Sequence, residues 1–346
     1  MTEPKRDDAD RITNSPEPFT DPADLEQMGV ELRRLDREAR HMMSAAELQK
    51  IEFPPLISYI DGMLLEGLGI LGGRPKIGKS AWALAAALTI ATGGVAFGNT
   101  ERQVKQAPVL YLALEDGGRR LQDRIQNLIG SDEKWPANLD LATQWKKFDA
   151  GGVEDLEDAI DVNEYKVVFI DTLARVRKQK KRGGDLYQGD SDAMAVIHDM
   201  TRERPGLAIQ MLHHNRKNEA PDDYIDVLSG STGITGVPDH VSVLHRTRGE
   251  ADAVIKFTSR DAAEHETAFA FQDRIWTELG NAAEYQMSRE RRDLHQLLNS
   301  LDQPTRLKDL AELLDKKSPT ILDQLRGLET EDLVVQDSET HMWRTT

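Results

Sequence analysis

The chain has 346 residues, enough for more than one folded unit, and its 60 acidic and 44 basic residues give a formal net charge of −16. This negative balance excludes an indiscriminate coating of duplex DNA, because neutralisation of phosphates supplies most non-specific affinity for DNA. The absence of cysteine excludes disulfides, cysteine-ligated zinc and thiol catalysis.

Residues 1–22 mix acidic residues, proline, asparagine and serine with almost no apolar side chains, which predicts a disordered tail. They contain no apolar core of the kind that a signal peptide requires. The longest apolar run, near residues 81–91, is shorter than the roughly 20 residues needed to cross a bilayer. We therefore expect a cytoplasmic protein that has no membrane partner.

Residues 23–52 are predicted to form an N-terminal helical arm. Apolar residues recur there every three to four positions, as in an amphipathic helix, at Leu25, Met28, Leu32, Leu35, Ala39, Met42 and Met43. Such a helix packs on its own domain or docks on a neighbouring subunit, and the sequence leaves both interpretations open. Phe53-Pro54-Pro55 then indicates a turn, because proline does not continue a helix. The main domain is predicted over residues 53–285.

A phosphate-binding loop is predicted at residues 73–80, which match the spacing G-x-x-x-x-G-K-[S/T]. In this motif backbone N–H groups face a polyphosphate, the lysine reaches the outer phosphates and the hydroxyl ligates magnesium. An apolar run at 64–71 precedes the loop and helix-forming residues follow it, so strand, loop and helix stand in the required order. We therefore assign Lys79 to catalysis and Ser80 to Mg2+. The residues predicted to bind ATP are Gly73, Arg74, Pro75, Lys76, Ile77, Gly78, Lys79, Ser80 and Ala81.

Two further predicted strands end in carboxylates. Residues 108–114 are followed by Glu115 and Asp116, and residues 166–170 are followed by Asp171. The carboxyl ends of parallel strands form the edge at which open α/β sheets bind ligands. Glu115 is predicted to align the attacking water, whereas Asp116 is assigned as the N-cap of the next helix. Asp171 closes a Walker B pattern and is predicted to hold the magnesium ion as part of the catalytic site.

The densest basic run of the chain extends from Arg175 to Arg182. Such a run forms either a solvated loop or a loop that faces a polyanion, here single-stranded DNA. Another predicted strand, at residues 207–214, ends in His213 and His214. Adjacent strand residues point to opposite faces, so one histidine would reach the nucleotide edge as a γ-phosphate sensor. Metal binding by this pair is not expected, because no third ligand stands at a useful spacing.

Two strands that pair with each other are predicted at residues 241–246 and 253–260. Arg246 and Arg260 lie at their ends and are either solvated or candidates for an arginine finger that reaches a neighbour's γ-phosphate. A single strand at Thr267–Trp276, with alternating small and aromatic residues, is expected to be the last strand of this domain.

Residues 286–346 are predicted to form a winged helix-turn-helix. Leucine-rich stripes predict helices from Ser288, Thr305 and Ser318, the last with Ser318 as its N-cap, and a hairpin follows them. The residues offered by the expected recognition helix are Lys316, Lys317, Thr320, Gln324 and Arg326. Acidic residues are interspersed among them, so duplex DNA and a protein remain equally open as partners.

In their order along the chain, these motifs resemble the RecA-like ATPases of the RepA type, ring-shaped replicative DNA helicases of plasmids and phages. The segments that carry the resemblance are 73–80, Leu112–Asp116, Phe169–Leu173, His213–Lys217 and Gly230-Ser231. The resemblance covers roughly residues 55–280 and implies an α/β fold, a RecA-like P-loop core with a mostly parallel central sheet. It also implies a hexamer with ATP between subunits and single-stranded DNA in a central channel. On this resemblance Glu115 matches the catalytic glutamate, Asp171 the Walker B aspartate and His214 the sensor.

The function expected from the sequence is an oligomeric ATPase that acts as a DNA motor, a replicative helicase of a mobile element. The winged helix and the N-terminal arm lie outside the minimal family core, and the acidic total departs from what a simple DNA motor suggests. An ATP-switched DNA-binding, recruitment or recombination-mediator protein without helicase activity is the alternative.

Overall fold

The computed structural model describes residues 28, 30–31, 34–37, 39–40, 42–177, 186–214, 236–246, 252–301, 303–338 and 340–346. The chain divides into two units, Met1–Pro55 and Leu56–Thr346. The predicted disordered tail at 1–22 lies outside the described residues.

In the first unit, the described residues include a short helix, α2 (Ala45–Leu48). Ser44 caps it, because the Ser44 side chain accepts from the Glu47 backbone N–H while the Glu47 carboxylate accepts from the Ser44 N–H. Several apolar side chains of the predicted arm are exposed, among them Leu35 and Met43. Both interpretations of the arm, packing on its own domain and docking on a neighbouring subunit, therefore stay predictions.

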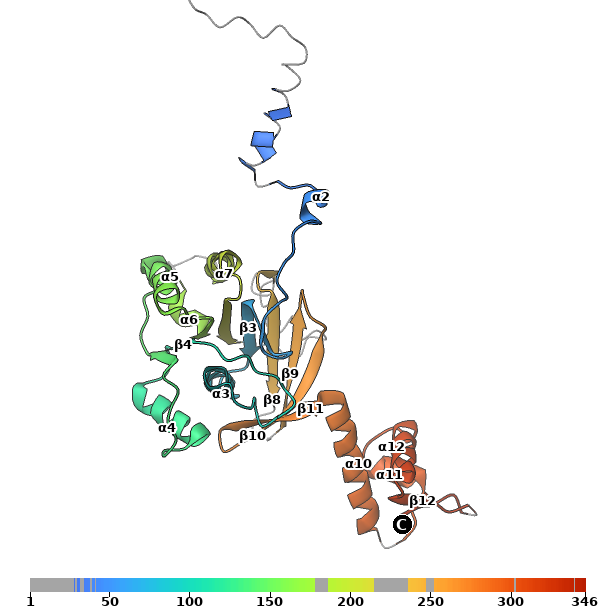
Figure 1. The fold of residues 1–346 in the computed structure, drawn as a ribbon. Helices are drawn as coiled ribbons and strands as arrows, with labels where there is room; N and C mark the ends of the chain where they lie inside the picture. Colours follow the sequence, from blue (N-terminus) through green and yellow to red (C-terminus); the bar gives the residue numbers. More distant parts are fainter. Residues whose placement is uncertain are drawn as a thin grey trace, which may run out of the picture. The chain divides into compact units, whose positions relative to one another are not determined.

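The second unit is built on a nine-stranded sheet in the order β11-β10-β9-β8-β3-β7-β6-β4-β5. Its strands are β3 (Gly67–Gly73), β4 (Val109–Ala113), β5 (Leu139–Ala142), β6 (Val167–Asp171), β7 (Ala208–His214), β8 (His240–Arg246), β9 (Asp252–Ser259), β10 (His265–Gln272) and β11 (Ile275–Asn281). The strands from β8 to β5 are parallel, and β9 to β11 extend the sheet antiparallel (Figure 1). The prediction of an α/β fold with a mostly parallel central sheet is confirmed. A separate pair, β1 (Ser58–Ile60) and β2 (Leu64–Leu65), precedes it.

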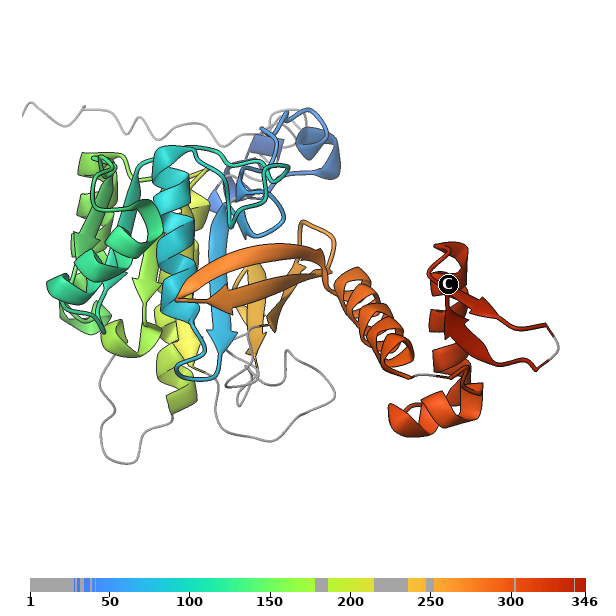
Figure 2. The same ribbon diagram turned by 90° about the horizontal axis from the view of Figure 1, so that it is seen from below.

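Helices cover both faces of the parallel part of the sheet (Figures 1 and 2). Those helices are α3 (Lys79–Thr92), α4 (Gly118–Ile129), α5 (Gly152–Asn163), α6 (Leu173–Val176) and α7 (Leu186–Glu203). One apolar core joins α3 and α4 to the sheet, and a second joins α5, α6 and α7 to its other face. In β6, for example, Val167 and Phe169 enter the first core, and Val168 and Ile170 enter the second. Burial on both faces explains why these strands are apolar throughout rather than alternating.

The prediction of one last strand at 267–276 is wrong. β10 and β11 form an antiparallel hairpin in which Phe271 stands opposite Trp276. The turn between them contains Asp273 and Arg274, with φ of 51° and 68°. Hairpin turns of this kind need positive φ, which glycine and asparagine usually supply. Neither residue type is present here, and the aromatic residues continue across the turn, so the sequence pattern concealed it.

The C-terminal part contains the helices and the hairpin expected from the sequence. They are α10 (Ala282–Ser300), α11 (Leu307–Leu313), α12 (Ser318–Thr330), β12 (Val334–Gln336) and β13 (Trp343–Thr345), which enclose an apolar core of their own. The interpretation of this part as a winged helix stays a prediction. The N-cap of α12 is Lys317, and Ser318 is already helical, so the assignment of Ser318 as the cap is wrong. The predicted boundary between residues 285 and 286 lies inside α10. No helix among the described residues combines the length and the apolar character needed to cross a membrane.

Candidate functional site

The loop between β3 and α3 has the backbone geometry that its glycines predict. Gly78 has a φ of 108°, a left-handed conformation, and a Cβ there would lie 2.7 Å from the Trp276 ring. A Cβ at Gly73 would lie 2.7 Å from Ile77 Cδ1 and 2.9 Å from the Leu244 carbonyl oxygen. Gly78 is the N-cap of α3 and has no side chain to cap it. The N–H groups of the first turn are therefore available to an anion at the loop.

Lys79 is the first residue of α3 and is buried. Its ammonium donates hydrogen bonds to the carbonyl oxygens of Gly73 (2.7 Å) and Arg74 (3.0 Å), and it lies 3.0 Å from His214 Nδ1. Burial lowers the pKa of Lys79 to about 8, an effect opposed by the carboxylates of Asp171 and Glu115. An anion held at the loop would favour the protonated lysine, so anion binding and the charge of Lys79 are linked.

Asp171 ends β6 with only 2 % of its surface exposed. The Tyr111 hydroxyl donates to its Oδ2 at 3.1 Å, while Oδ1 is buried without a hydrogen-bond partner among the described residues. Burial raises the pKa of Asp171, and the hydroxyls of Ser80 and Tyr111 lower it in part. A buried carboxylate that has one oxygen without a partner, and that the Ser80 hydroxyl also contacts, fits Mg2+. This ion takes few protein oxygens and completes its coordination with water and phosphate. The residues present thus suit the ion that the sequence predicts.

Glu115 and His214 meet at the same edge of the sheet. In the register of the sheet, Ala113 pairs with Asp171 and Gly73 pairs with His214, which brings the ends of β4, β6, β3 and β7 together. His214 Nε2 lies 3.6 Å from Glu115 Oε2, so the imidazole connects the carboxylate to Lys79. Burial, followed by the charge of Lys79, lowers the pKa of His214 and favours the neutral ring. The structure therefore brings together Lys79, Asp171, Glu115 and His214.

Asp116 has a different role from the predicted one. The N-cap of α4 is Gly117, so the assignment of Asp116 as a cap is wrong. The Asp116 carboxylate instead accepts hydrogen bonds from Arg120, at 2.9 Å, and from Arg124. Only 6 % of the Asp116 side chain is exposed, and it fixes both guanidinium groups on the first turns of α4.

The two candidates for an arginine finger lie at opposite ends of a pair of neighbouring strands, because β8 and β9 are antiparallel and each arginine lies near the C-terminal end of its own strand. Arg246, at the end of β8, donates to the Ile77 carbonyl oxygen of its own phosphate loop at 3.4 Å. Its guanidinium also lies 4.5 Å from the centroid of the Phe271 ring. Arg260 follows β9, donates to the Gly236 carbonyl oxygen at 2.6 Å and is far along the sheet from the loop. The finger role of either residue stays a prediction.

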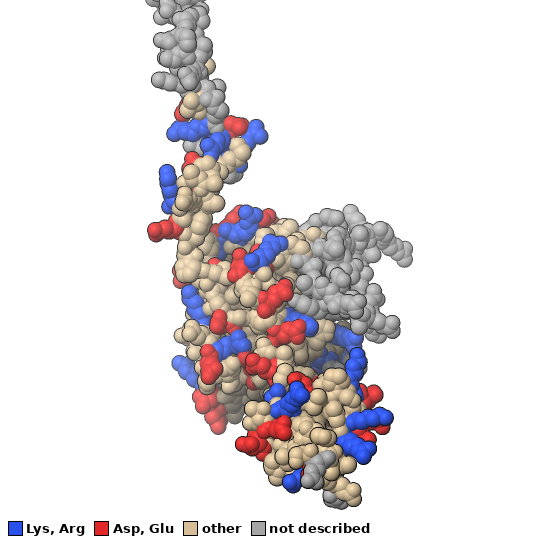
Figure 3. Space-filling view, turned by 90° about the vertical axis from the view of Figure 1, so that its right-hand side faces the viewer, with Lys and Arg blue, Asp and Glu red and all other residues tan. Residues whose placement is uncertain are grey.

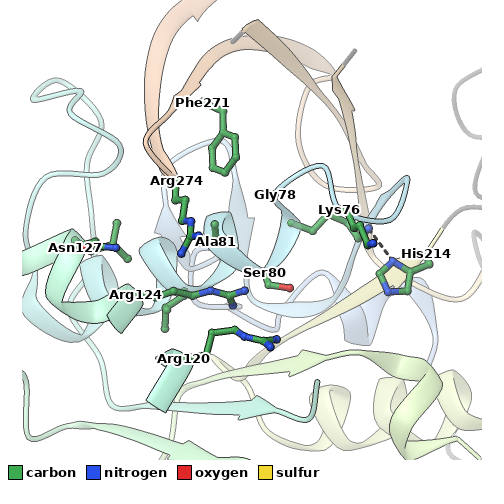
Figure 4. A pocket seen from close by; sticks show the side chains of 13 residues that line it. Lys76, Gly78, Ser80, Ala81, Arg120, Arg124, Asn127, His214, Phe271 and Arg274 are labelled. Carbon is green, nitrogen blue, oxygen red and sulfur yellow. Dashed lines mark hydrogen bonds between the residues drawn. The ribbon is translucent and has the colours of Figure 1, made fainter. Parts of the chain in front are cut away.

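A cavity of about 410 Å3 opens beside the phosphate loop (Figure 4). It is lined by Lys76, Gly78, Lys79, Ser80, Ala81, Leu84, Arg120, Arg124, Asn127, Leu128, His214, Phe271 and Arg274. The contributions of α4 and of the β10–β11 hairpin were missed from the sequence. The spacing of Asp116, Arg120 and Arg124, four residues apart, could have indicated that these arginines are held in place. Arg274 was missed because the hairpin turn itself was missed.

Trp276 is a further residue that the sequence did not indicate. Its indole N–H donates to the Gly78 carbonyl oxygen at 3.0 Å, and its ring packs on Phe271 with the centroids 4.3 Å apart. The hairpin thus contacts the phosphate loop directly. No motif signals such a contact, because the two residues are 198 positions apart.

Part of the predicted DNA-binding run, residues 178–182, is outside the described residues, and so are residues 215–217 and Gly230-Ser231 of the segments that carry the resemblance. The first cation of the run, Arg175, is described and lies 3.7 Å from Glu115 Oε1. On α12, Gln324 is buried and donates to Glu290, so its prediction as an exposed recognition residue is wrong. Lys316 is 2.9 Å from the same carboxylate. Basic and acidic side chains are intermixed on the face shown in Figure 3.

Comparison with known proteins gives one family match. The family model described as AAA domain matches residues 33–220, more than half of the chain. None of the curated proteins matches. A solved structure described as a DnaB-like replicative helicase and its interactions with primase is similar, with a TM-score of 0.46 and 15 % sequence identity. The similarity covers 61 % of this chain and 57 % of that chain, so this chain spans less than two thirds of the other protein.

Proposed function

Because the chain belongs to the AAA domain family, we propose that it binds ATP at the loop of residues 73–80 and hydrolyses it. The observation that supports this best is the meeting of Lys79, Asp171, Glu115 and His214 at one edge of the sheet. Phosphoryl transfer needs mainly positioning and compensation of charge, and this group of side chains supplies both.

Each residue of the group has a distinct task in this proposal. The N–H groups of the loop and the Lys79 ammonium hold the phosphates, and Glu115 positions the attacking water and accepts its proton. His214 stands between Lys79 and Glu115 and keeps both in place through its two ring nitrogens. Ser80 and Asp171 would hold Mg2+, which offsets the charge of the phosphates when bound.

Two substitutions separate binding from hydrolysis. Lys79→Ala removes a direct phosphate contact, so we expect it to abolish both ATP binding and turnover. Glu115→Gln keeps the shape of the site but removes the base, so ATP binding should persist while turnover falls by a factor of about 10² to 10⁴. Calorimetry measures the binding and phosphate release measures the turnover. Unchanged turnover in Lys79→Ala would contradict the assignment of the site.

We also propose that ATP hydrolysis drives an oligomeric DNA motor, a replicative helicase of a mobile element that acts on single-stranded DNA. The order of the sequence motifs and the basic run that starts at Arg175 support this. Arg175 lies 3.7 Å from Glu115, so a strand bound by the run would act next to the carboxylate that positions water. The expected assembly is a hexamer with ATP between its subunits.

The second candidate is an ATP-switched protein that binds duplex DNA or a protein through its C-terminal part. The exposure of Lys317, Thr320 and Arg326 on and before α12 favours it. A helicase would hydrolyse ATP faster with single-stranded DNA and would separate strands with one polarity, whereas a switch would hydrolyse slowly and bind through residues 288–346. ATPase and unwinding assays with both kinds of DNA distinguish the two. Electron microscopy with an ATP analogue and single-stranded DNA would identify rings, filaments or dimers.

A further inference from the structure

The cavity beside the phosphate loop extends well past the groups that would hold phosphates. His214 lies at one end of it and Asn127 at the other, with Ser80 between them (Figure 4). The rest of the lining comes from the loop, from the first two turns of α3, from α4 and from the β10–β11 hairpin. The parts of a nucleotide that remain beyond the triphosphate are the sugar and the base. We propose that this outer half seats the base, and that Asn127 selects adenine; the proposal rests on the ATPase function proposed above.

The outer half offers an apolar surface of the kind that a flat base requires. Leu84 of α3 is fully buried beneath it, and Leu128 of α4 and Phe271 of the hairpin are half-buried at its sides. Apolar side chains add nothing to the recognition of phosphate, but they take an aromatic ring out of water. This part of the cavity therefore suits a base better than a further anion.

Two guanidinium groups flank this surface from different elements. Arg124 comes from α4, where Asp116 fixes it, and Arg274 comes from the hairpin turn. Figure 4 shows both side chains directed into the cavity near Ala81. Guanidinium planes stack on nucleobases, and none of the described residues that line the cavity is acidic. Charge and shape on both sides thus favour a stacked base.

Asn127 supplies the means to distinguish bases. Its carboxamide has both a donor and an acceptor, which match the N6 amino group and N7 of adenine. Guanine presents two acceptors, O6 and N7, at the corresponding edge, so the same carboxamide cannot pair with both of them. Asn127 lines the cavity on the same helix as Arg124. Asn127 is exposed and lies on the Arg274 side of the cavity, away from His214 (Figure 4), so a base seated there would meet its carboxamide.

The cations of the cavity are also compatible with the phosphates of single-stranded DNA. The apolar surface and the carboxamide favour a base, because neither recognises a phosphodiester. Competition between DNA and nucleotide is therefore one outcome of the test.

The test measures the binding of ATP, GTP, CTP and tripolyphosphate to the full chain by calorimetry with magnesium present. We expect the wild type to prefer ATP to GTP by about tenfold or more, as one bidentate pair provides. Asn127→Arg should shift the ATP:GTP ratio toward GTP by about tenfold, because a guanidinium donates to both O6 and N7 of guanine. Arg274→Lys keeps the positive charge but loses the planar guanidinium that would stack on the base. ATP binding should therefore weaken severalfold while tripolyphosphate binding stays constant. Arg119→Ala, exposed on α4 outside the cavity lining, is the matched control and should change nothing.

Several results would overturn the base site. One is that ATP, GTP and CTP bind within about twofold of one another, which leaves the ATPase function intact. Another is an ATP:GTP ratio that Asn127→Arg does not move. A third is displacement of ATP by single-stranded DNA together with an Arg274→Lys defect in DNA binding alone. If neither ATP nor tripolyphosphate binds the wild type, the proposed ATPase function fails as well.

Discussion

The two parts of the central sheet serve the site in different ways. The parallel part, from β8 to β5, brings Asp171, Glu115 and His214 to one edge through the register of its strands. The antiparallel part, β9 to β11, places Phe271 and Trp276 against the phosphate loop. The side chains proposed to act on ATP thus come from the parallel part, whereas the loop is in contact with the antiparallel part.

This difference shows that the loop has a local sequence motif but is also held by contacts with residues far away in the sequence. Gly78 is required for its positive φ, and its missing side chain also leaves room for Trp276. The loop and the hairpin therefore fit each other. Substitutions in the parallel part should affect chemistry, and substitutions in the hairpin should affect stability and nucleotide binding.

The largest effect in the hairpin is expected from Trp276→Ala. The indole is buried, packs on Phe271 and donates to Gly78, so its loss leaves a cavity beside the loop. We expect the free energy of unfolding to fall by about 3–5 kcal/mol and the KM for ATP to rise more than kcat falls. Urea denaturation and steady-state kinetics measure the two effects.

Two variants make that experiment specific. Trp276→Phe keeps most of the apolar surface but loses the hydrogen bond, which should cost about 1 kcal/mol. Trp343 is equally buried, but in the C-terminal core, so Trp343→Ala should destabilise the chain without changing the KM for ATP. A rise in KM of the same size in Trp343→Ala would contradict a special connection between the hairpin and the loop.

A smaller effect is expected from Lys79, in the parallel part: the affinity for ATP should fall when the pH rises. Burial lowers the pKa of Lys79 to about 8, and bound phosphate would raise it again. Above pH 8 the free protein must take up a proton when ATP binds, so the affinity for ATP should fall by up to about tenfold per pH unit. Below pH 8 Lys79 is already charged, so the affinity should level off. Calorimetry in buffers with different heats of ionisation measures the proton uptake.

The matched variant for the pH effect belongs to the antiparallel part. Arginine side chains in general do not titrate in this range. Arg274→Ala should therefore leave the shape of the pH profile unchanged even if the affinity falls. An affinity that is constant between about pH 7 and 9.5, without proton uptake, would show that Lys79 does not titrate on binding.

The parallel part of the sheet could be predicted from the sequence because the patterns that indicate it are short and continuous in the chain. The loop at 73–80 has its own spacing, and each of the apolar runs before Glu115, Asp171 and His214 ends in a polar residue. Parallel strands place such ends at one edge whatever their exact register. The parallel sheet and the proximity of these side chains were therefore predictable without knowledge of the order of the strands, and their roles stay predictions.

The residues that were missed depend on distant contacts or on an irregular turn. The Asp273–Arg274 turn lacks glycine, so the hairpin read as one strand, and the positions of Arg274 and Trp276 could not be derived. Gln324 looked exposed because helix periodicity alone does not reveal its hydrogen bond to Glu290 in another helix. Pairings of this kind are determined by tertiary structure, which one sequence does not contain.

The smallest effect should distinguish the two arginines that the sequence treated alike. Arg246→Ala removes the contacts with the Ile77 carbonyl oxygen and with the Phe271 ring, so the KM for ATP should rise a few fold, about 0.5–1 kcal/mol. Arg260 is bound to the Gly236 carbonyl oxygen at the opposite edge of the sheet, so Arg260→Ala should leave the KM unchanged. Steady-state kinetics of the two variants, measured side by side, test this directly. Equal increases in KM would mean that the contacts of Arg246 with the loop do not support ATP binding. The difference between the two parts of the sheet would then not extend to β8 and β9.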